Sequence, residues 1–403
     1  MIPKVFAQSR RPLYGLWFAT VIVSLFFIQA IRPPEYIKHA SVLYDTLPAD
    51  SVITLRLLAA GDAMAHLPQT QAAWDSAQNS YAYADVFKWI SPVLKGYDLR
   101  FINLETPLGG EPYKGYPQFS APDAYAADLF QAGFNYFFLA NNHAVDRYNR
   151  GILRTIHALD SMKIPHTGIF SDSSDRASRY PVIIEKNGIR LAILNATFST
   201  NGISSKPPVK VNYVNRAEIL ADLASALKYN PDFIIMVIHW GDEYKLLPGA
   251  YQTETAKFLA ENGVDVIIGH HPHVLQPVGW IKTGTKGQEK ETLVIWSLGN
   301  FFSNQRDRYR DGAMFTGMTL EKNLLSKTKA VHDIHYYPFW VRRADKPLNF
   351  SIIPCELPAS LLGNDTLNAT EKAAFEFFSN DTRNRIGKES KLRELRFYTE
   401  ATE

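Results

Sequence analysis

Residues 264–276 read VDVIIGHHPHVLQ, a largely apolar, β-branched run that ends in Gly269 and continues into three histidines within four positions. In an extended chain, residues two apart point to the same side, so His271 and His273 are expected to face one point. Two imidazole nitrogens that converge suit zinc, manganese or iron, and Pro272 restricts the backbone between them. The alternative is a surface loop that happens to carry histidines. Because three of the chain's eleven histidines fall here, the pattern favours a metal site.

The same arrangement recurs along the chain, where short runs rich in Val, Ile, Leu and Phe end in polar side chains. Such runs, separated by helix-like stretches, are typical of a largely parallel sheet covered on both faces, and open α/β sheets bind ligands beyond the carboxyl ends of their strands. A single polar residue after a strand is usually a helix cap or a turn residue, but the recurrence predicts one site. The side chains at or just after the other runs include Asp62, His66, Glu105, Asn141, Asn142, His143, Asp146, His239, Asp242, Glu243 and Asn300.

The amino-acid composition limits which kinds of binding site the chain can form. The formal net charge is +3 with acidic and basic residues mixed throughout, which argues against a nucleic-acid-binding surface. The lone cysteine, Cys355, allows no intrachain disulfide and excludes a zinc-thiolate cluster, so any metal must use nitrogen and oxygen ligands. Once the N-terminal segment is set aside, about 350 residues remain, enough for one large α/β domain with additions.

The N-terminal segment predicts a membrane anchor. Residues 13–31 are uncharged and close to the length of about 20 residues that crosses a bilayer as a helix. Three basic residues on the short side predict a cytoplasmic N-terminus and an exported remainder; they are Lys4, Arg10 and Arg11. A cleaved signal peptide is the competing interpretation, but it would have a shorter apolar core and small residues before a cut. We expect a single-pass protein of the cell membrane whose main domain is extracytoplasmic, periplasmic or at the cell surface.

The expected organisation has four parts. They are a cytoplasmic stub and transmembrane signal-anchor over 1–31, a linker over 32–51, the main domain over 52–356 and a polar, helical C-terminal extension over 357–403.

Two local sequence patterns predict further features of the main domain. Asn187-Gly188 lies between two apolar runs and predicts a β-hairpin, so part of the sheet is antiparallel. The loop over 106–122 is rich in glycine, proline and aromatic residues; it either overlies the site and contacts substrate or is an ordinary surface loop.

Six sequence blocks occur in order: GDAM at 61–64, NLE at 103–105, ANNHAVDRYNRGI at 140–152, HWGDEY at 239–244, GHHPHVLQPV at 269–278 and SLGNFFSNQ at 297–305. These blocks resemble those of the CapA family of capsule or poly-γ-glutamate synthesis proteins, a family that is similar to the calcineurin-like metallophosphoesterases. The resemblance implies an α/β fold, a two-sheet sandwich flanked by helices, with a two-metal centre at the strand ends. The transmembrane helix expected from the N-terminal residues would precede this domain.

The resemblance also implies roles for the matching residues. Asp62 and Glu105 are expected to be carboxylate ligands, with Glu105 the better candidate for bridging two ions. His143, with Asp146 beside it, is expected to serve catalysis as an acid or a stabiliser of the transition state. The centre would hold one or two divalent ions of manganese, iron or zinc and would position hydroxide for in-line attack. The remaining implied ligands are Asn142, His239, His271 and His273.

The sequence also departs from the phosphoesterase pattern. The usual first Asp-x-His is absent, since the nearest histidine, His66, follows Asp62 by four positions, and the bridging aspartate is replaced by Glu105. These differences leave open how many ions bind and whether phosphate is the substrate. His66 either supplies the missing imidazole or caps the next turn. Three further residues are expected to be ligands or to orient ligands: His270, Asn300 and Glu243.

Two functional classes fit these patterns. The first is a membrane-anchored metallohydrolase that cleaves a phosphoester, or another ester or amide bond, in a cell-surface polymer or its precursor. The second is a non-catalytic subunit of a capsule or polyglutamate synthesis and export complex, working with other membrane proteins of that pathway. An amidohydrolase barrel also uses a His-x-His pair, but it places the pair on its first strand, whereas here the pair comes late in the chain.

Overall fold

The apolar runs form β-strands that end where the polar side chains of the expected site begin. Asp62 lies near the end of one strand, Glu105 follows another directly, and His239 and His270 are the last residues of two more. Alternate residues of these strands face different apolar cores, so both faces are buried and the runs are apolar throughout. The strands are β1 (Val52–Ala63), β4 (Leu99–Leu104), β11 (Phe233–His239) and β12 (Val266–His270).

The computed structural model describes residues 51–285, 288–363, 366–388, 390 and 392–398. The transmembrane helix expected over 13–31 lies outside the described residues, as does nearly all of the expected linker. Within the described part, every helix is too short or too polar to span a bilayer.

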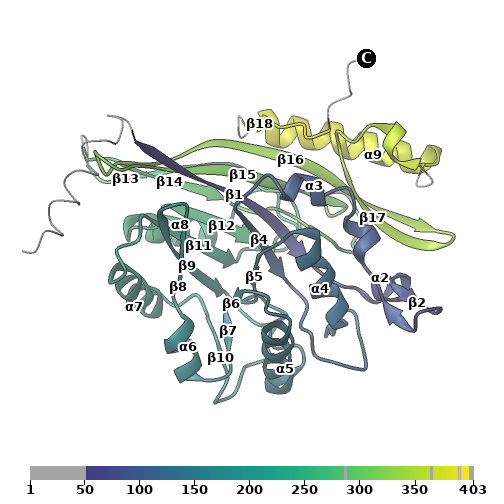
Figure 1. Cartoon of the computed structure of the whole chain (residues 1–403), viewed down its shortest axis with the longest axis horizontal. Helices are drawn as coiled ribbons and strands as arrows, with labels where there is room; N and C mark the ends of the chain where they lie inside the picture. The colour runs from purple at the N-terminus through teal and green to yellow at the C-terminus, as the bar shows by residue number, and fades with distance from the viewer. Residues whose placement is uncertain (1–50, 286–287, 364–365, 389, 391, 399–403) are drawn as a thin grey trace, which may run out of the picture. The chain divides into compact units, whose positions relative to one another are not determined.

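The larger sheet has the strand order β17-β16-β15-β1-β4-β5-β6, with β18 paired to β16 (Figure 1). Strands β1, β4, β5 and β6 are parallel, whereas β15, β16 and β17 continue the sheet in antiparallel pairs. The register of β1 against β4 shifts after Ala59 and places Asp62 opposite Asn103. The added strands are β5 (Tyr136–Phe138), β6 (His166–Thr167), β15 (Gly312–Asn323), β16 (Lys329–Asp345), β17 (Leu348–Pro354) and β18 (Arg393–Glu394).

The second sheet has the order β13-β14-β12-β11-β9-β8. Its four inner strands are parallel, and the two edge strands are antiparallel to their neighbours. The hairpin predicted at Asn187-Gly188 is confirmed: it joins β8 to β9, and both turn residues have positive φ, 54° and 76°. The new strands are β8 (Val182–Lys186), β9 (Ile189–Thr197), β13 (Val278–Thr283) and β14 (Lys290–Ile295).

The two sheets pack face to face with helices on their outer faces. One apolar core lies between the sheets and contains Leu57 and Phe101 from the first sheet and Ile193, Val237 and Ile268 from the second. A second core joins the first sheet to α4 and α5, and a third joins the second sheet to α7 and α8. These helices are α4 (Asp123–Ala132), α5 (Tyr148–Ser161), α7 (Arg216–Leu227) and α8 (Ala250–Glu261).

Shorter elements complete the domain. They are the helices α2 (Leu67–Ala72), α3 (Ser91–Leu94) and α6 (Ser173–Arg179), the 3-10 helices η1 (Ala84–Phe87) and η2 (Ala359–Leu361), the hairpin strands β2 (Trp74–Asp75) and β3 (Ser80–Tyr81), and the paired strands β7 (Ile169–Phe170) and β10 (Lys210–Val211).

The C-terminal tail forms more than the expected helical extension. Helix α9 (Ala369–Thr382) lies along β16 (Figure 1) and buries Phe378 against Trp340 and Ile353. A π-helical turn, η4 (Arg383–Gly387), follows it, and the chain then adds β18 to the larger sheet. The tail therefore contributes to the same compact unit as the sheets, Asp50–Glu403.

Glu356 follows β17 beside this tail, and both of its carboxylate oxygens are buried without a hydrogen-bond partner among the described residues. Burial raises the pKa of Glu356 to about 7. Between about pH 4.5 and pH 7, Glu356 keeps its proton in the folded chain but has lost it in the unfolded chain. The stability of the folded state therefore falls as the pH rises through this range.

Substituting Glu356→Gln is expected to remove this pH dependence. The variant should gain stability relative to the parent as the pH rises from 5 to 8, by up to about 3 kcal/mol. Urea unfolding of both chains at several pH values in this range measures the difference. Parallel stability curves for the two chains would contradict the assignment.

Candidate metal centre

The carboxyl ends of strands from both sheets meet at one place and bring the predicted ligands together. Asp62 and Glu105 come from β1 and the end of β4 in the first sheet, whereas His239, His271 and His273 come from β11 and the segment after β12 in the second. All five side chains are buried, with exposed fractions of 4% or less. Residues separated by more than 200 positions thus share one site.

The segment carrying His271 and His273 is a bend rather than an extended strand. Strand β12 ends at His270, and both following histidines have positive φ, 97° and 58°. The prediction that His271 and His273 lie in an extended segment is therefore wrong, because the backbone bends around Pro272. The two rings still lie together, with centroids 5.8 Å apart. A positive φ is strained for a residue with a Cβ, so the bend holds these imidazoles at a cost in backbone energy.

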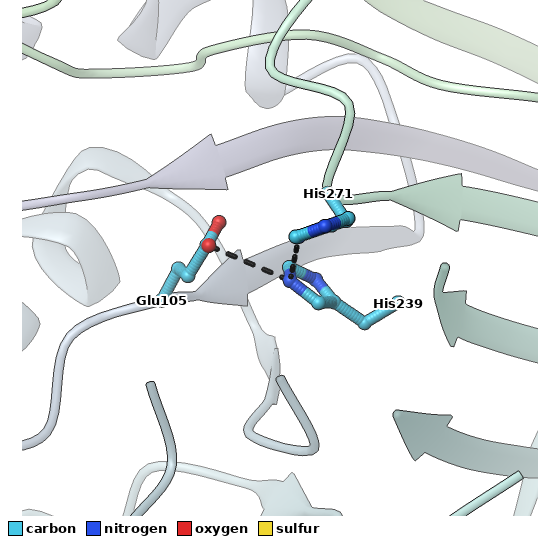
Figure 2. A group of neighbouring side chains, drawn as sticks. All are labelled: Glu105, His239 and His271. Atoms are coloured by element: carbon cyan, nitrogen blue, oxygen red, sulfur yellow. Dashed lines mark hydrogen bonds and ion pairs between the residues drawn. The ribbon is translucent and has the colours of Figure 1, made fainter. Parts of the chain in front are cut away.

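Glu105, His239 and His271 form the first group whose geometry could hold a metal ion (Figure 2). His239 Nε2 lies 3.4 Å from Glu105 Oε1 and 3.1 Å from His271 Nδ1. Asn142 adds its carboxamide oxygen, Oδ1, 2.9 Å from the same His239 nitrogen. Two imidazoles, a carboxylate and a carboxamide therefore point at one position, a donor set that suits a divalent transition metal.

Asp62, Glu105 and His273 form a second group. His273 Nδ1 lies 3.3 Å from Asp62 Oδ2, and its Nε2 lies 3.7 Å from Glu105 Oε1. Glu105 belongs to both groups, so its carboxylate lies where one side chain could contact two ions. A third group combines His271 and His273 with the exposed Glu243, which places that carboxylate on the solvent side of the site.

The hydrogen bonding and the protonation states of the donor side chains favour a bound cation. Neither oxygen of Glu105 has a hydrogen-bond partner among the described residues, although the side chain is fully buried. Burial and the neighbouring charge of Asp62 raise the pKa of Glu105 well above its ordinary value. Burial also lowers the pKa of His239 far below its ordinary value and lowers that of His271 to about 3. The lowered pKa values keep the imidazoles neutral, as metal binding requires, whereas Glu105 would give up its proton to a bound cation. Leaving such groups buried without a cation is costly.

Hydrogen bonds hold Asp62 in place. Its Oδ1 accepts from Asn103 Nδ2 at 2.8 Å and lies 3.1 Å from His270 Nδ1, while the backbone N–H of His271 donates to Oδ2 at 3.2 Å. Burial raises the pKa of Asp62, but the contacts with His270 and His273 outweigh burial and leave it well below its ordinary value. His270 therefore acts on the site through Asp62, in line with the orienting role considered for it.

His143 and Asp146 form a pair at the edge of the centre. His143 Nδ1 lies 2.7 Å from Asp146 Oδ2, which also accepts the backbone N–H of Phe119 at 2.8 Å. The Phe119 ring packs edge-on against His143 at 4.7 Å between centroids. The carboxylate and the ring together fix the imidazole, and they leave its Nε2 as the atom available for proton transfer.

His66 and Asn300 lie near the centre and outside the three groups found among the described residues. His66 begins the first turn of α2, where its backbone N–H donates to Gln69 Oε1 at 2.9 Å, a geometry in line with the turn-cap alternative. Burial lowers the pKa of His66 to about 4. Asn300 donates from Nδ2 to Arg310 O at 3.0 Å, and its Oδ1 is buried without a partner among the described residues.

Two further asparagines belong to the site: Asn103, which was not selected from the sequence, and Asn141, which was noted there as a polar residue after a strand but given no role. Asn103 Nδ2 contacts both Asp62 and, at 3.4 Å, His239 Nδ1, so it links ligands from the two sheets. Asn141 donates to Leu104 O at 2.9 Å and accepts the backbone N–H of His143 at 3.1 Å. The signal for Asn103 was its position two residues before Glu105, because alternate residues of a strand share a face.

Comparison with known proteins identifies relatives of this chain. Residues 56–305 match the model of a family described as bacterial capsule synthesis protein PGA_cap. The chain is 32% identical over 248 residues to "Capsule biosynthesis protein CapA" of Bacillus anthracis, covering 59% of this chain and 58% of that protein. It is 28% identical over 240 residues to "PGA biosynthesis protein CapA" of Bacillus subtilis, covering 57% and 60%. The matches therefore span less than two thirds of the length of these relatives.

Solved structures with a partial likeness include a nucleotidase and a calcineurin-like phosphoesterase. The NAD nucleotidase of Haemophilus influenzae superposes with a TM-score of 0.46 at 15% identity, covering 83% of this chain and 68% of that one. The calcineurin-like phosphoesterase YfkN of Bacillus subtilis superposes with a TM-score of 0.41 at 14% identity, covering 83% and 99%.

Substituting Glu105→Gln tests the site without removing a buried side chain. After chelation, we expect the variant to unfold at the same temperature as the parent or higher, because the amide carries no charge to desolvate. Addition of Mn²⁺ or Zn²⁺ at a hundred to a thousand times Kd should stabilise the parent by about 3–4 kcal/mol and the variant by much less.

Calorimetric unfolding with and without metal measures both effects. Glu254→Gln, at an exposed position of α8, is the matched control and should respond to metal like the parent. Equal stabilisation of parent and Glu105→Gln would contradict a role of Glu105 in metal binding.

Proposed function

The chain belongs to the bacterial capsule synthesis protein family PGA_cap, and we propose that it is a metal-dependent hydrolase acting on a cell-surface polymer or its precursor. The buried, unpartnered carboxylate of Glu105, shared by two groups of potential ligands, is the observation that carries this proposal. A merely structural carboxylate would be expected to have hydrogen-bond partners at this depth. The favoured bond is a phosphoester, with another ester or an amide bond as the alternative.

A divalent ion in such a site acidifies a bound water and polarises the bond under attack. The residues of the chain supply position and proton transfer. Asp62, Glu105, His239, His271 and His273 would hold one or two ions of manganese, iron or zinc. Asp146 fixes the His143 ring through Nδ1, so Nε2 is free to give a proton to the leaving group.

A cavity beside the His143–Asp146 pair is a candidate position for part of the substrate. Its volume is about 330 Å³, and its lining combines two carboxylates, Glu111 and Asp146, with the guanidinium groups of Arg147 and Arg150. Two guanidinium groups next to a proposed proton donor suit a phosphoryl or carboxylate group of the substrate.

The hydrolase proposal predicts that His143→Ala loses activity but keeps its metal. We expect kcat toward p-nitrophenyl phosphate or its diester to fall about 10²–10⁴-fold, the size of a lost general acid. The double variant His271→Ala/His273→Ala should lose both metal and activity. Elemental analysis and steady-state kinetics of the full chain separate the two effects.

His157→Ala, at an exposed position of α5, is the matched control for these variants and should behave like the parent. A parent chain that binds no manganese, iron or zinc after reconstitution would overturn the hydrolase proposal. Unchanged kcat in His143→Ala would overturn the acid role alone.

A second candidate function is a non-catalytic subunit of a capsule or poly-γ-glutamate synthesis complex. The names of the Bacillus relatives, which describe biosynthesis, favour it. In this role the fold and the metal would serve binding to other membrane proteins of the pathway. A chain that binds metal and hydrolyses no phosphoester, ester or amide would support this candidate over the first.

We further propose that residues 13–31 anchor the protein in the cell membrane, with the main domain outside the cytoplasm. The uncharged stretch and the basic residues before it support this arrangement. The full chain should remain in the membrane pellet after alkaline carbonate extraction, and protease added to spheroplasts should digest its main domain. Recovery in the supernatant, or protection from protease, would contradict the proposal.

A further inference from the structure

An aromatic groove lies beside the loop that follows Glu105. Its volume is about 500 Å³. The side chains that matter for the argument are Leu67, Gln71, Trp74, Tyr81, Glu111 and Tyr113. They come from three separate segments: helix α2, the β2–β3 hairpin and the loop over 106–122 (Figure 1).

The hairpin presents an aromatic surface to solvent. Trp74 pairs with Tyr81 across the two short strands, and their rings lie 4.9 Å apart. Tyr113 of the loop meets Tyr81 edge-on at 5.2 Å. Trp74 is 43% exposed, although a large aromatic side chain gains from burial. The three rings thus form a platform onto which a flat, partly apolar ligand could stack.

The groove adjoins the proposed metal centre through packed side chains. Gly115 of the loop packs so tightly on α2 that a Cβ there would lie 2.8 Å from the backbone nitrogen of Leu67. The preceding residue, His66, contacts Phe119 edge-on at 5.0 Å between centroids, and Phe119 contacts His143. One loop therefore forms a wall of the groove and also supports the His143–Asp146 pair.

The charge of the groove selects against an anionic ligand. Of the described residues that line the groove, Glu111 alone is charged, and none is a lysine or an arginine. A polyglutamate chain, with a carboxylate on every residue, would meet Glu111 in a groove whose described lining holds no lysine or arginine. A sugar ring has apolar C–H faces that stack on aromatic rings, and its hydroxyls can bond the Gln71 amide and the Glu111 carboxylate.

We propose that this groove binds a neutral sugar ring of a saccharide chain next to the metal centre. The inference rests on the proposed hydrolase function and names its substrate class: a saccharide-containing polymer or precursor. The ring is held at Trp74, Tyr81 and Tyr113.

Calorimetric titration of the full chain with neutral hexasaccharides tests the proposal. The probes are the β-1,4-linked hexamers of glucose and of N-acetylglucosamine, with poly-γ-glutamate as the anionic comparison. The protein is kept in a detergent without a sugar headgroup and is stripped of metal by chelation. Binding is therefore measured independently of hydrolysis, and failure of the hydrolase proposal does not affect the result.

We expect at least one hexasaccharide to bind, and Trp74→Ala and Tyr113→Ala to raise its Kd roughly tenfold each, the size of a lost stacking contact. The two substitutions lie in different segments, so a local disturbance of the hairpin cannot explain both. Trp280→Ala is the matched control, because Trp280 is also 43% exposed and lies on β13. It should leave Kd unchanged, and all variants should keep the parent's unfolding temperature.

Three outcomes would overturn the proposal. They are no binding of either hexasaccharide, binding that Trp74→Ala and Tyr113→Ala leave unchanged, and binding of poly-γ-glutamate that these two variants abolish. The last outcome would assign the groove to the anionic polymer.

Discussion

The carboxylate of Glu105 is the constraint around which the site is arranged. It is fully buried, lacks a hydrogen-bond partner among the described residues, and lies within 3.7 Å of imidazoles from two different segments. An isolated buried carboxylate destabilises a fold, and its raised pKa records that penalty. A divalent ion would remove the penalty and satisfy both neighbouring imidazoles at once. Metal binding at the proposed centre would thus be coupled, through this one side chain, to the stability of the strand ends around it.

The sandwich of two sheets makes this arrangement possible. Parallel strands from each sheet end at the same place, and their apolar residues are buried on both faces, so the cores fix where each strand stops. Asn103 then links the two sheets by contacting Asp62 from the first and His239 from the second. Ligands that are distant in sequence are therefore held by packing on rigid elements, and only short segments at the strand ends need special geometry.

Much of the fold and of the candidate site follows from local sequence patterns. Apolar runs that end in Asp, Glu or His predict the strands and place the ligands, and Asn187-Gly188 predicts a hairpin that the structure contains. Features that depend on contacts between distant segments were not accessible in this way. The bend at His271, the link made by Asn103 and the addition of β18 to the larger sheet each arise from tertiary packing. The aromatic groove belongs to the same class, because Trp74 and Tyr113 come together only through the folded loop.

The backbone of the histidine bend restricts which residues suit its two positions. Positive φ at His271 and His273 is the conformation that glycine adopts without strain. Replacement of either histidine by glycine would relieve the backbone, but it would also remove a buried imidazole and leave a cavity. The backbone and the buried side chain therefore make opposite demands on each of these two positions, and glycine would meet only the demand of the backbone.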